Sequence, residues 1–497
     1  MKYNVIIYII NIIVQFVSRT FFLKILGSEY LGVNGLFDNI LTILSLTDMG
    51  IGSVLLYSLY EPLASKDTNK LKKFINEYKK IYKLIALIVF IEGICFIPFL
   101  RFFVEEMPNI PNIEIIFILY LLNMIVSYLC FYKISIINAD QKNYIVSVIQ
   151  QIFGIISKVC MIIVLLVTHN YILYLMIHIL FSIASNIYIS KKAEKMYPCI
   201  KDTKGYKLDI EEKRKIKKET FATIFHKVAG VILNGTDNIL IFSIIGFKEV
   251  GIYANYVTII YWIKELVYKY FLSISASVGN MNAEASKKCL YEAFKKIFYG
   301  NFWIYTFCAI CLYFLLNPFI ELWIGSQYVF DSYVVFAIVL IFYLEGMRYT
   351  VLNFRDAMGL FSKDKYKAII EAILNIVISI ILAKKFGIIG IFLGTICSML
   401  CTCIWVEPYV VFKHGFKLNV KLYFKIYLRY IVIGIASFCL TYFANRLIVE
   451  NTITSFIIRI FVTVFVSNMV IILSTYKTDE FKCFFNIIKK LIKREQG

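Results

Sequence analysis

The chain has 497 residues, 60% of them hydrophobic, and its mean hydropathy is +0.74. A soluble domain is closer to half apolar, and a single core stops growing well below this length, so the composition excludes an ordinary soluble globular protein. The formal net charge of +20 does not indicate nucleic-acid binding, because the lysines and arginines gather in alternate loops between apolar runs.

The apolar residues form runs of about 20 residues, which is the length needed to cross the hydrocarbon core of a bilayer as a helix. About fourteen runs are predicted to span the membrane, at 4–25, 33–57, 81–104, 114–137, 144–167, 171–190, 219–244, 251–276, 298–320, 332–354, 366–384, 388–412, 424–444 and 454–474. Lysine-rich loops follow the second, sixth, eighth, tenth and twelfth runs. Because cytoplasmic loops carry this excess, both termini are expected in the cytoplasm.

Two segments of the chain resemble each other. Residues 25–40 read ILGSEYLGVNGLFDNI and residues 244–259 read IIGFKEVGIYANYVTI, so that Gly27 matches Gly246 and each copy joins two apolar runs. This repeat predicts two related halves, and the even number of spans between the copies gives the halves the same orientation. In membrane proteins built from two such halves the substrate site lies between them, which makes transport the first hypothesis.

The predicted fold is therefore an all-α integral membrane protein with two pseudo-symmetric six-helix lobes and two additional C-terminal helices. The predicted parts are an N-lobe at 1–190, a basic cytoplasmic connector at 191–218, a C-lobe at 219–412, spans thirteen and fourteen at 413–474, and a cytoplasmic amphipathic tail at 475–497. In the tail, Thr478 is expected to cap a helix whose first turn is acidic.

The first span carries Asn11, Gln15 and Arg19 on one helical face. Charges within the membrane are costly and usually face a cavity or a partner. Arg19 is the candidate for binding an anion, because a guanidinium stays protonated and its planar fork matches two phosphate oxygens. The alternative is a structural ion pair with Asp38 or Asp48 of the second span.

The seventh span carries Asn234, Asp237 and Asn238 on one broad face. The repeat matches Gln15 with Asn234 and Arg19 with Asn238, so each half is expected to present a polar stripe to the cavity. Asp237 is the candidate for a coupling cation, either Na⁺ or H⁺, because an intramembrane carboxylate is functional by default. The alternative is a hydrogen bond that stabilises a helix interface.

Two lysines are candidates to bind an anion with Arg19. Lys158 lies in the middle of the fifth span without a local acidic partner, and Lys227 lies towards the cytoplasmic end of the seventh span. Glu345 and Arg348, three residues apart on the tenth span, are instead expected to neutralise each other.

Several kinds of chemistry find no support in the sequence. The twelve cysteines mostly lie inside apolar runs and the four histidines are dispersed, so no metal site is predicted. No phosphate-binding Gly-Lys-Ser/Thr loop is present. The predicted outer loops are short, which leaves little room for an external catalytic domain.

Residues Leu26–Ala64, which read LGSEYLGVNGLFDNILTILSLTDMGIGSVLLYSLYEPLA, resemble the opening segment of the bacterial polysaccharide transporters, the flippases of lipid-linked oligosaccharide repeat units. Residues Phe225–Gly246, FHKVAGVILNGTDNILIFSIIG, resemble the start of their second lobe. That family belongs to the multidrug/oligosaccharidyl-lipid/polysaccharide exporter superfamily, together with multidrug and toxin extrusion proteins and lipid II flippases.

The resemblance implies alternating access and a substrate of oligosaccharide on undecaprenyl pyrophosphate, moved across the bacterial cytoplasmic membrane for capsule, O-antigen or exopolysaccharide synthesis. It implies membrane lipids and other polysaccharide assembly proteins as partners. From the sequence itself, no nucleic acid, no cofactor and no catalytic residues are expected. Lipid II flippases carry cavity arginines on their first helices, where Arg19 has a comparable place. The alternatives are a multidrug exporter of the same fold, which would favour acidic cleft residues, and a membrane glycan polymerase or ligase, which would need a sizeable outer loop.

Overall fold

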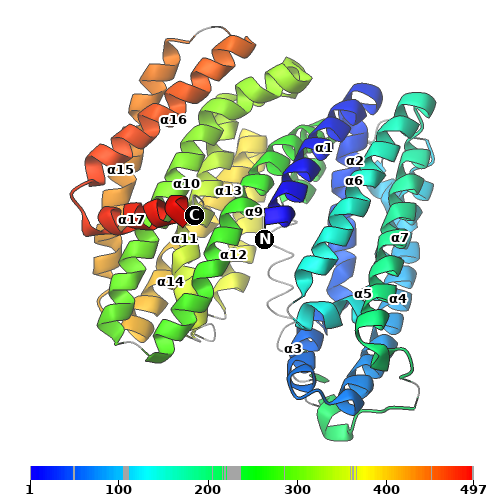
Figure 1. Ribbon diagram of the computed structural model, residues 1–497. Helices are drawn as coiled ribbons and strands as arrows, with labels where there is room; N and C mark the ends of the chain where they lie inside the picture. The colour runs from blue at the N-terminus through cyan, green and yellow to red at the C-terminus, as the bar shows by residue number, and fades with distance from the viewer. Residues whose placement is uncertain are drawn as a thin grey trace. The chain divides into compact units, whose positions relative to one another are not determined.

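The structure is a computed structural model, and it describes residues 2–48, 51–104, 111–140, 142–203, 205–214, 216–217, 220, 237–284, 286–358, 360, 363–364, 366–448, 450 and 452–494 (Figure 1). Throughout these residues the regular elements are helices, and none is a strand. The chain divides into two compact units, Met1–Gly251 and Ile252–Gly497. The predicted all-α membrane fold is confirmed.

The first unit is built from long helices that pack side by side. In it α6 packs against α1 and α7, and α5 packs against α4 and α7. Its elements are α1 (Lys2–Leu26), α2 (Ser28–Leu44), the 3-10 helix η1 (Ser45–Asp48), α3 (Ile51–Ala64), α4 (Thr68–Val104), α5 (Ile113–Ala139), α6 (Asn143–Thr168), α7 (Tyr171–Met196), η2 (Pro198–Ile200), the π-helix η3 (Ile241–Ile245) and the first turn of α9 (Phe247–Glu284).

In the second unit α10 is the central helix, and it packs against α11, α15, α16 and α17. The helix α17 runs crosswise to α15 and α16 (Figure 1). Besides the rest of α9, the elements are α10 (Lys287–Ile324), η4 (Ser326–Tyr328), α11 (Ser332–Ala357), α12 (Lys367–Phe386), α13 (Ile388–Cys401), α14 (Cys403–Val410), the π-helix η6 (Val411–Phe416), α15 (Lys421–Arg446), α16 (Ile453–Thr475) and α17 (Asp479–Arg494).

Nine helices in the described part of the chain are long and apolar enough to cross a membrane. They are Thr68–Leu100, Ile113–Ala139, Asn143–Thr168, Tyr171–Met196, Lys287–Ile324, Ser332–Ala357, Ile388–Phe416, Lys421–Arg446 and Ile453–Thr475. The first predicted span corresponds to α1, the eighth to α9 and the eleventh to α12. The seventh, at 219–244, lies largely outside the described residues.

Two predicted spans are interrupted rather than continuous. The second, at 33–57, is divided by η1, where the Ser45 hydroxyl donates to the Thr42 carbonyl at 2.6 Å and the Thr47 hydroxyl donates to the Glu92 carboxylate at 2.8 Å. The twelfth, at 388–412, breaks at Thr402, whose backbone leaves the helical region at φ −127° and ψ −78°. Polar side chains satisfy local groups at both interruptions, which makes irregular backbone tolerable at membrane depth.

The two copies of the repeat both turn at their first glycine. Gly27 joins α1 to α2 at φ +86°, and Gly246 precedes α9 at φ +138°. These are conformations that favour glycine over any residue with a Cβ atom. In the first unit, the ring of Phe247 packs so closely on Gly32 that a Cβ atom there would approach it to 2.6 Å. Because the first unit ends at Gly251, it includes the turn at Gly246. The predicted boundary between the lobes, at 191–218, stays a prediction.

The predicted basic connector packs in part against the N-terminal end of α4. The Asn76 amide donates to the Tyr206 carbonyl at 2.7 Å, and Lys73 pairs with Asp209 at 3.4 Å. The tail forms the predicted helix α17, and the backbone N–H of Phe481 donates to the Thr478 hydroxyl at 3.3 Å, as expected for a cap. Both predicted cytoplasmic segments therefore dock on helices of their own unit.

Candidate substrate cavity

A cavity of about 430 Å³ lies within the first unit, between helices far apart in the sequence. Helix α1 contributes Gln15 and Arg19, α6 contributes Lys158, and α7 contributes Tyr174 and His178. Arg19 and Lys158, both candidates for binding an anion, thus line the same cavity. A cavity with several cationic side chains can bind an anion that is too polar to enter the bilayer.

Lys158 is held by two amides from α1. Its ammonium donates to the Asn11 Oδ1 atom at 2.6 Å and to the Gln15 Oε1 atom at 3.4 Å. Neither partner is acidic, so these two contacts orient the ammonium without cancelling its charge. Asn11 and Gln15, predicted to line the cavity, therefore lie beside the cation that they position.

Arg19 reaches the same cavity from the next turn of α1. Its guanidinium lies within electrostatic range of the Tyr174 hydroxyl on α7. Asp38, one of the two carboxylates considered as an alternative partner, lines a neighbouring cavity together with Tyr120 and His178. The role of Arg19 in substrate binding stays a prediction.

His178 is a cavity residue that the sequence analysis missed. It lies within electrostatic range of Lys158, and it lines both the cavity of Arg19 and the neighbouring cavity of Asp38. The signal was present in the sequence, since polar residues recur every three or four positions along α7, at Tyr171, Tyr174, His178, Ser182 and Ser185. That spacing places them on one helical face.

Phe22, Asn34 and Tyr174 line the cavity, and further aromatic side chains pack against them. Asn34 Oδ1 accepts hydrogen bonds from the hydroxyl groups of Tyr120, at 2.7 Å, and of Tyr171. The Tyr171 ring contacts the ring of Tyr30 edge-on at a centroid distance of 5.0 Å, and Phe22 lies 5.3 Å from Tyr174. Aromatic faces with polar edges suit a ligand that is partly apolar and partly hydroxylated.

The candidates from the seventh predicted span are placed differently. Lys227 and Asn234 lie outside the described residues. Asp237 and Asn238 are in the helical segment that precedes η3. The described linings of the two first-unit cavities do not include Asp237 or Asn238. Their predicted roles stay predictions.

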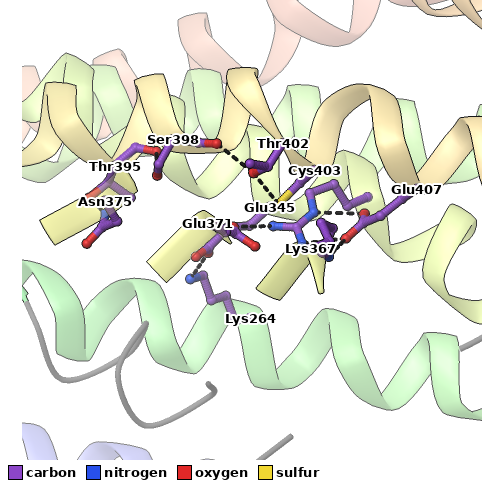
Figure 2. A network of polar contacts seen from close by, with 11 residues as sticks. Lys264, Glu345, Lys367, Glu371, Asn375, Thr395, Ser398, Thr402, Cys403 and Glu407 are labelled. Atoms are coloured by element: carbon purple, nitrogen blue, oxygen red, sulfur yellow. Dashed lines mark hydrogen bonds and ion pairs between the residues drawn. The ribbon is translucent and has the colours of Figure 1, made fainter. Parts of the chain in front are cut away.

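A second set of intramembrane charges forms a closed ionic network in the second unit (Figure 2). The Arg348 guanidinium donates to both oxygens of Glu407, at 3.0 and 2.7 Å, and approaches Glu371 at 3.7 Å. Lys367 also pairs with Glu407, whose side chain is fully buried. Each of these charges has an opposite partner, so this cluster is complete without a ligand.

The network corrects one prediction. Glu345 does not neutralise Arg348, although the two residues lie three apart on α11. Glu345 pairs instead with Lys264 of α9 (Figure 2). Arg348 pairs with Glu407 of α14. A bidentate, buried contact with Glu407 is stronger than a local pair on one helix surface, which explains the exchange of partners.

A third cavity, of about 420 Å³, lies in the second unit between α10, α11 and α15. Its described lining includes Tyr313, Phe336, Tyr343 and Phe438 and contains no charged side chain. Of these three cavities, the one lined by Arg19 and Lys158 is therefore the candidate for an anionic ligand.

No family model and no curated protein matches the sequence. Among solved structures, the chain is similar to the lipid II flippase MurJ in an inward closed conformation, with 18% identity, a TM-score of 0.69, and coverage of 95% of this chain and 98% of that chain. It is also similar to an inward-facing multidrug resistance MATE family transporter of the MOP superfamily, with 11% identity, a TM-score of 0.62, and coverage of 82% and 95%. A mutant of the Vibrio cholerae MATE transporter VcmN matches at 13% identity and a TM-score of 0.52, with coverage of 82% and 99%.

These identities are low, but the similarity to MurJ extends over nearly the whole chain. They show a shared fold, which agrees with the predicted all-α membrane architecture. The chain has the same fold as these solved flippase and transporter structures.

Proposed function

We propose that the protein is a flippase that moves undecaprenyl-pyrophosphate-linked oligosaccharide repeat units across the bacterial cytoplasmic membrane, for the synthesis of a surface polysaccharide. The observation that carries this proposal is that Arg19 and Lys158, from α1 and α6, line one cavity within the membrane-spanning helices. The transporter fold supports translocation as the activity.

The diphosphate is the part of this substrate that the cavity suits best. A guanidinium binds two phosphate oxygens through parallel N–H groups, and an ammonium adds a point charge. Asn11 and Gln15 hold Lys158 in place for this contact. Lys227 is proposed as a third cation, and Asn234 and Asn238 are proposed to contact the glycan.

The lipid tail is proposed to remain in the bilayer while the two lobes alternate between inward-open and outward-open states. Both termini would lie in the cytoplasm. Asp237 is proposed to bind the coupling ion, Na⁺ or H⁺. The substrate would be received from, and delivered to, other membrane proteins of polysaccharide assembly.

A multidrug exporter shares the fold, but a cavity for cationic drugs would be expected to present carboxylates rather than Arg19 and Lys158. This contrast favours an anionic substrate.

The proposal is tested by complementation of a bacterial strain that lacks its own repeat-unit flippase. The variants are Arg19→Ala and Arg19→Lys, with Arg429→Ala, an exposed arginine of α15, as the matched control. We expect wild-type protein and the control to restore surface polysaccharide, the alanine variant to restore at least tenfold less, and the lysine variant to be intermediate. Full restoration by Arg19→Ala at equal protein level would remove Arg19 from the mechanism.

A further inference from the structure

The cationic cavity has a neighbour of a different chemical character. This second cavity has a volume of about 490 Å³, and its polar lining comprises Asp38, Thr42, Ser45, Tyr120, Asn123 and His178. Asp38 is the one Asp, Glu, Lys or Arg residue among its described lining residues. The first unit therefore places a cavity that bears a carboxylate beside a cavity that bears Arg19 and Lys158.

The two cavities share a wall. His178 lines both of them. Asn34 of the cationic cavity accepts a hydrogen bond of 2.7 Å from the hydroxyl group of Tyr120, which lines the second cavity. A ligand with two covalently joined groups of different charge could therefore place one group in each cavity.

The second cavity is rich in hydrogen-bond acceptors. The Thr42 hydroxyl donates its hydrogen to the Asp38 carbonyl at 2.7 Å, and the Ser45 hydroxyl donates to the Thr42 carbonyl at 2.6 Å. Both hydroxyl groups can then offer only lone pairs to a ligand. The Asn123 Oδ1 atom is buried and has no hydrogen-bond partner within the described part of the chain. These groups and the Asp38 carboxylate are hydrogen-bond acceptors, so the cavity suits a ligand that donates many hydrogen bonds.

A sugar ring meets this requirement, because each hydroxyl group donates a hydrogen bond and an amino sugar donates more. In a lipid-linked repeat unit the first sugar is bonded directly to the diphosphate, so its binding site must adjoin the phosphate site. An acidic sugar would instead bring its carboxylate close to Asp38, and two negative charges at short distance repel each other.

We propose that the cavity lined by Asp38 receives the sugar attached directly to the diphosphate, and that it selects a neutral or amino sugar over a uronic acid. This inference rests on the proposed function, because it takes the cationic cavity as the diphosphate site. It adds a specificity determinant, Asp38, and a junction residue, His178.

The test measures binding to the purified full-length protein by calorimetry, with two matched probes. Glucose 1-phosphate and glucuronic acid 1-phosphate differ only at C6, where a hydroxymethyl group is replaced by a carboxylate. Wild-type protein is expected to bind glucose 1-phosphate about tenfold more tightly than glucuronic acid 1-phosphate. The variant Asp38→Asn is expected to reduce this preference to less than threefold, and Asp38→Glu, which keeps the charge, is expected to retain it.

Inorganic pyrophosphate is the probe that separates this inference from the proposed function. Its affinity should fall at least tenfold in Arg19→Ala and stay within twofold in Asp38→Asn. Asp209→Asn, an exposed aspartate outside both cavities, is the matched control, and Asp38→Ser is a second neutral variant if Asp38→Asn does not fold.

Arg19-dependent pyrophosphate binding without any preference between the two sugar phosphates would overturn the inference alone. A preference that survives in both neutral variants would also overturn it. Absence of pyrophosphate binding would overturn the proposed function and this inference with it.

Discussion

At the scale of single residues, the charges within the membrane fall into two kinds. Arg348, Lys367, Glu371 and Glu407 form a closed network in the second unit, in which each charge has an opposite partner. Lys158 in the first unit is held instead by the side-chain amides of Asn11 and Gln15. Opposite charges offset the free-energy cost of burial in the network of the second unit, and amide dipoles offset that cost at Lys158.

The positioning of Lys158 can be tested by changing Asn11. We expect Asn11→Leu to weaken pyrophosphate binding about threefold to tenfold, because the ammonium loses its closest hydrogen-bond acceptor. The same change made in a Lys158→Met background should have no further effect on affinity. A full additional loss in that background would show that Asn11 acts independently of Lys158. Calorimetric titration of the three variants gives the answer.

The ionic network should matter for stability. Glu407→Gln leaves Arg348 and Lys367 buried with one carboxylate fewer, and the expected loss is about 3–5 kcal/mol of stability. Glu345→Gln is the matched comparison, because the Lys264–Glu345 pair is about one-third exposed, at 37% for each side chain, and should contribute about 1 kcal/mol or less. Thermal unfolding in detergent measures the loss of stability in each variant. Equal decreases in melting temperature would contradict the larger contribution of Glu407.

Sequence alone could identify Arg19 and Lys158 as candidates, because a charge within an apolar span is conspicuous. It could not identify their surroundings. Lys158 meets Asn11 through the packing of α6 on α1, which no local pattern encodes. The exchange of partners between Glu345 and Arg348 has the same cause, since helices distant in sequence supply Lys264 and Glu407.

At the scale of helices, small residues decide how closely elements approach. Helices α12 and α13 meet where a Cβ atom added to Gly394 would lie 2.6 Å from the Ser379 backbone. Small residues spaced four apart, Gly390 and Gly394 on α13, and Ser379 and Ala383 on α12, allow this contact.

A substitution at Gly394 tests this packing. Gly394→Ala should destabilise the protein by about 1–3 kcal/mol, because backbone atoms of α12 would have to move. Gly434→Ala on α15 is the control, since its added Cβ would meet only the Thr306 methyl group at an ordinary 3.5 Å. The control should be neutral or slightly stabilising, because alanine favours the helix. Thermal unfolding in detergent measures both variants, and a neutral Gly394→Ala would contradict the close contact.

The α5–α6 turn is joined to the end of α7 by a hydrogen bond outside the membrane spans. The Tyr197 hydroxyl donates to the Asp140 carboxylate at 2.5 Å, and Lys142 pairs with the same carboxylate at 2.6 Å. The hydrogen bonds from Lys142 and Tyr197 hold the pKa of Asp140 below its ordinary value of 3.8. The ionised carboxylate is therefore the form that stabilises the fold.

This pair predicts a pH dependence with a definite sign. A lowered pKa in the folded state gives stability that is present above pH 3.8 and is lost as the pH falls through the folded-state pKa. We expect Tyr197→Phe to cost about 1 kcal/mol at pH 7 and the difference from wild type to shrink below pH 3.8. Melting temperatures of wild type and Tyr197→Phe, measured between pH 7 and pH 3, check this prediction. A difference in melting temperature that grows on acidification would contradict it.

The spans themselves were predictable from hydropathy, but their interruptions were not. The ranges at 33–57 and 388–412 read as continuous apolar runs, yet η1 and the break at Thr402 divide them. Their polar groups are satisfied locally or by a neighbouring helix, as Thr47 is by Glu92, and this satisfaction depends on tertiary packing.

At the scale of the whole molecule, the repeat in the sequence predicted the architecture. Gly27 and Gly246 both turn the chain with positive φ, and the similarity to MurJ covers 95% of the chain. Sequence could not predict that the second turn would group with the first unit through Phe247 and Gly32, because that contact joins residues far apart in the chain.

In the proposed mechanism, a cationic cavity carries the diphosphate of a lipid-linked glycan across the membrane. The most direct measurement is translocation in proteoliposomes, with an undecaprenyl-pyrophosphate-linked oligosaccharide on one leaflet and a glycan-cleaving enzyme outside. We expect wild-type protein and Arg429→Ala to translocate the lipid-linked glycan, and Arg19→Ala to translocate it at a rate at least tenfold lower. Equal rates for wild type and Arg19→Ala, or transport of cationic drugs without movement of the lipid-linked glycan, would contradict this mechanism.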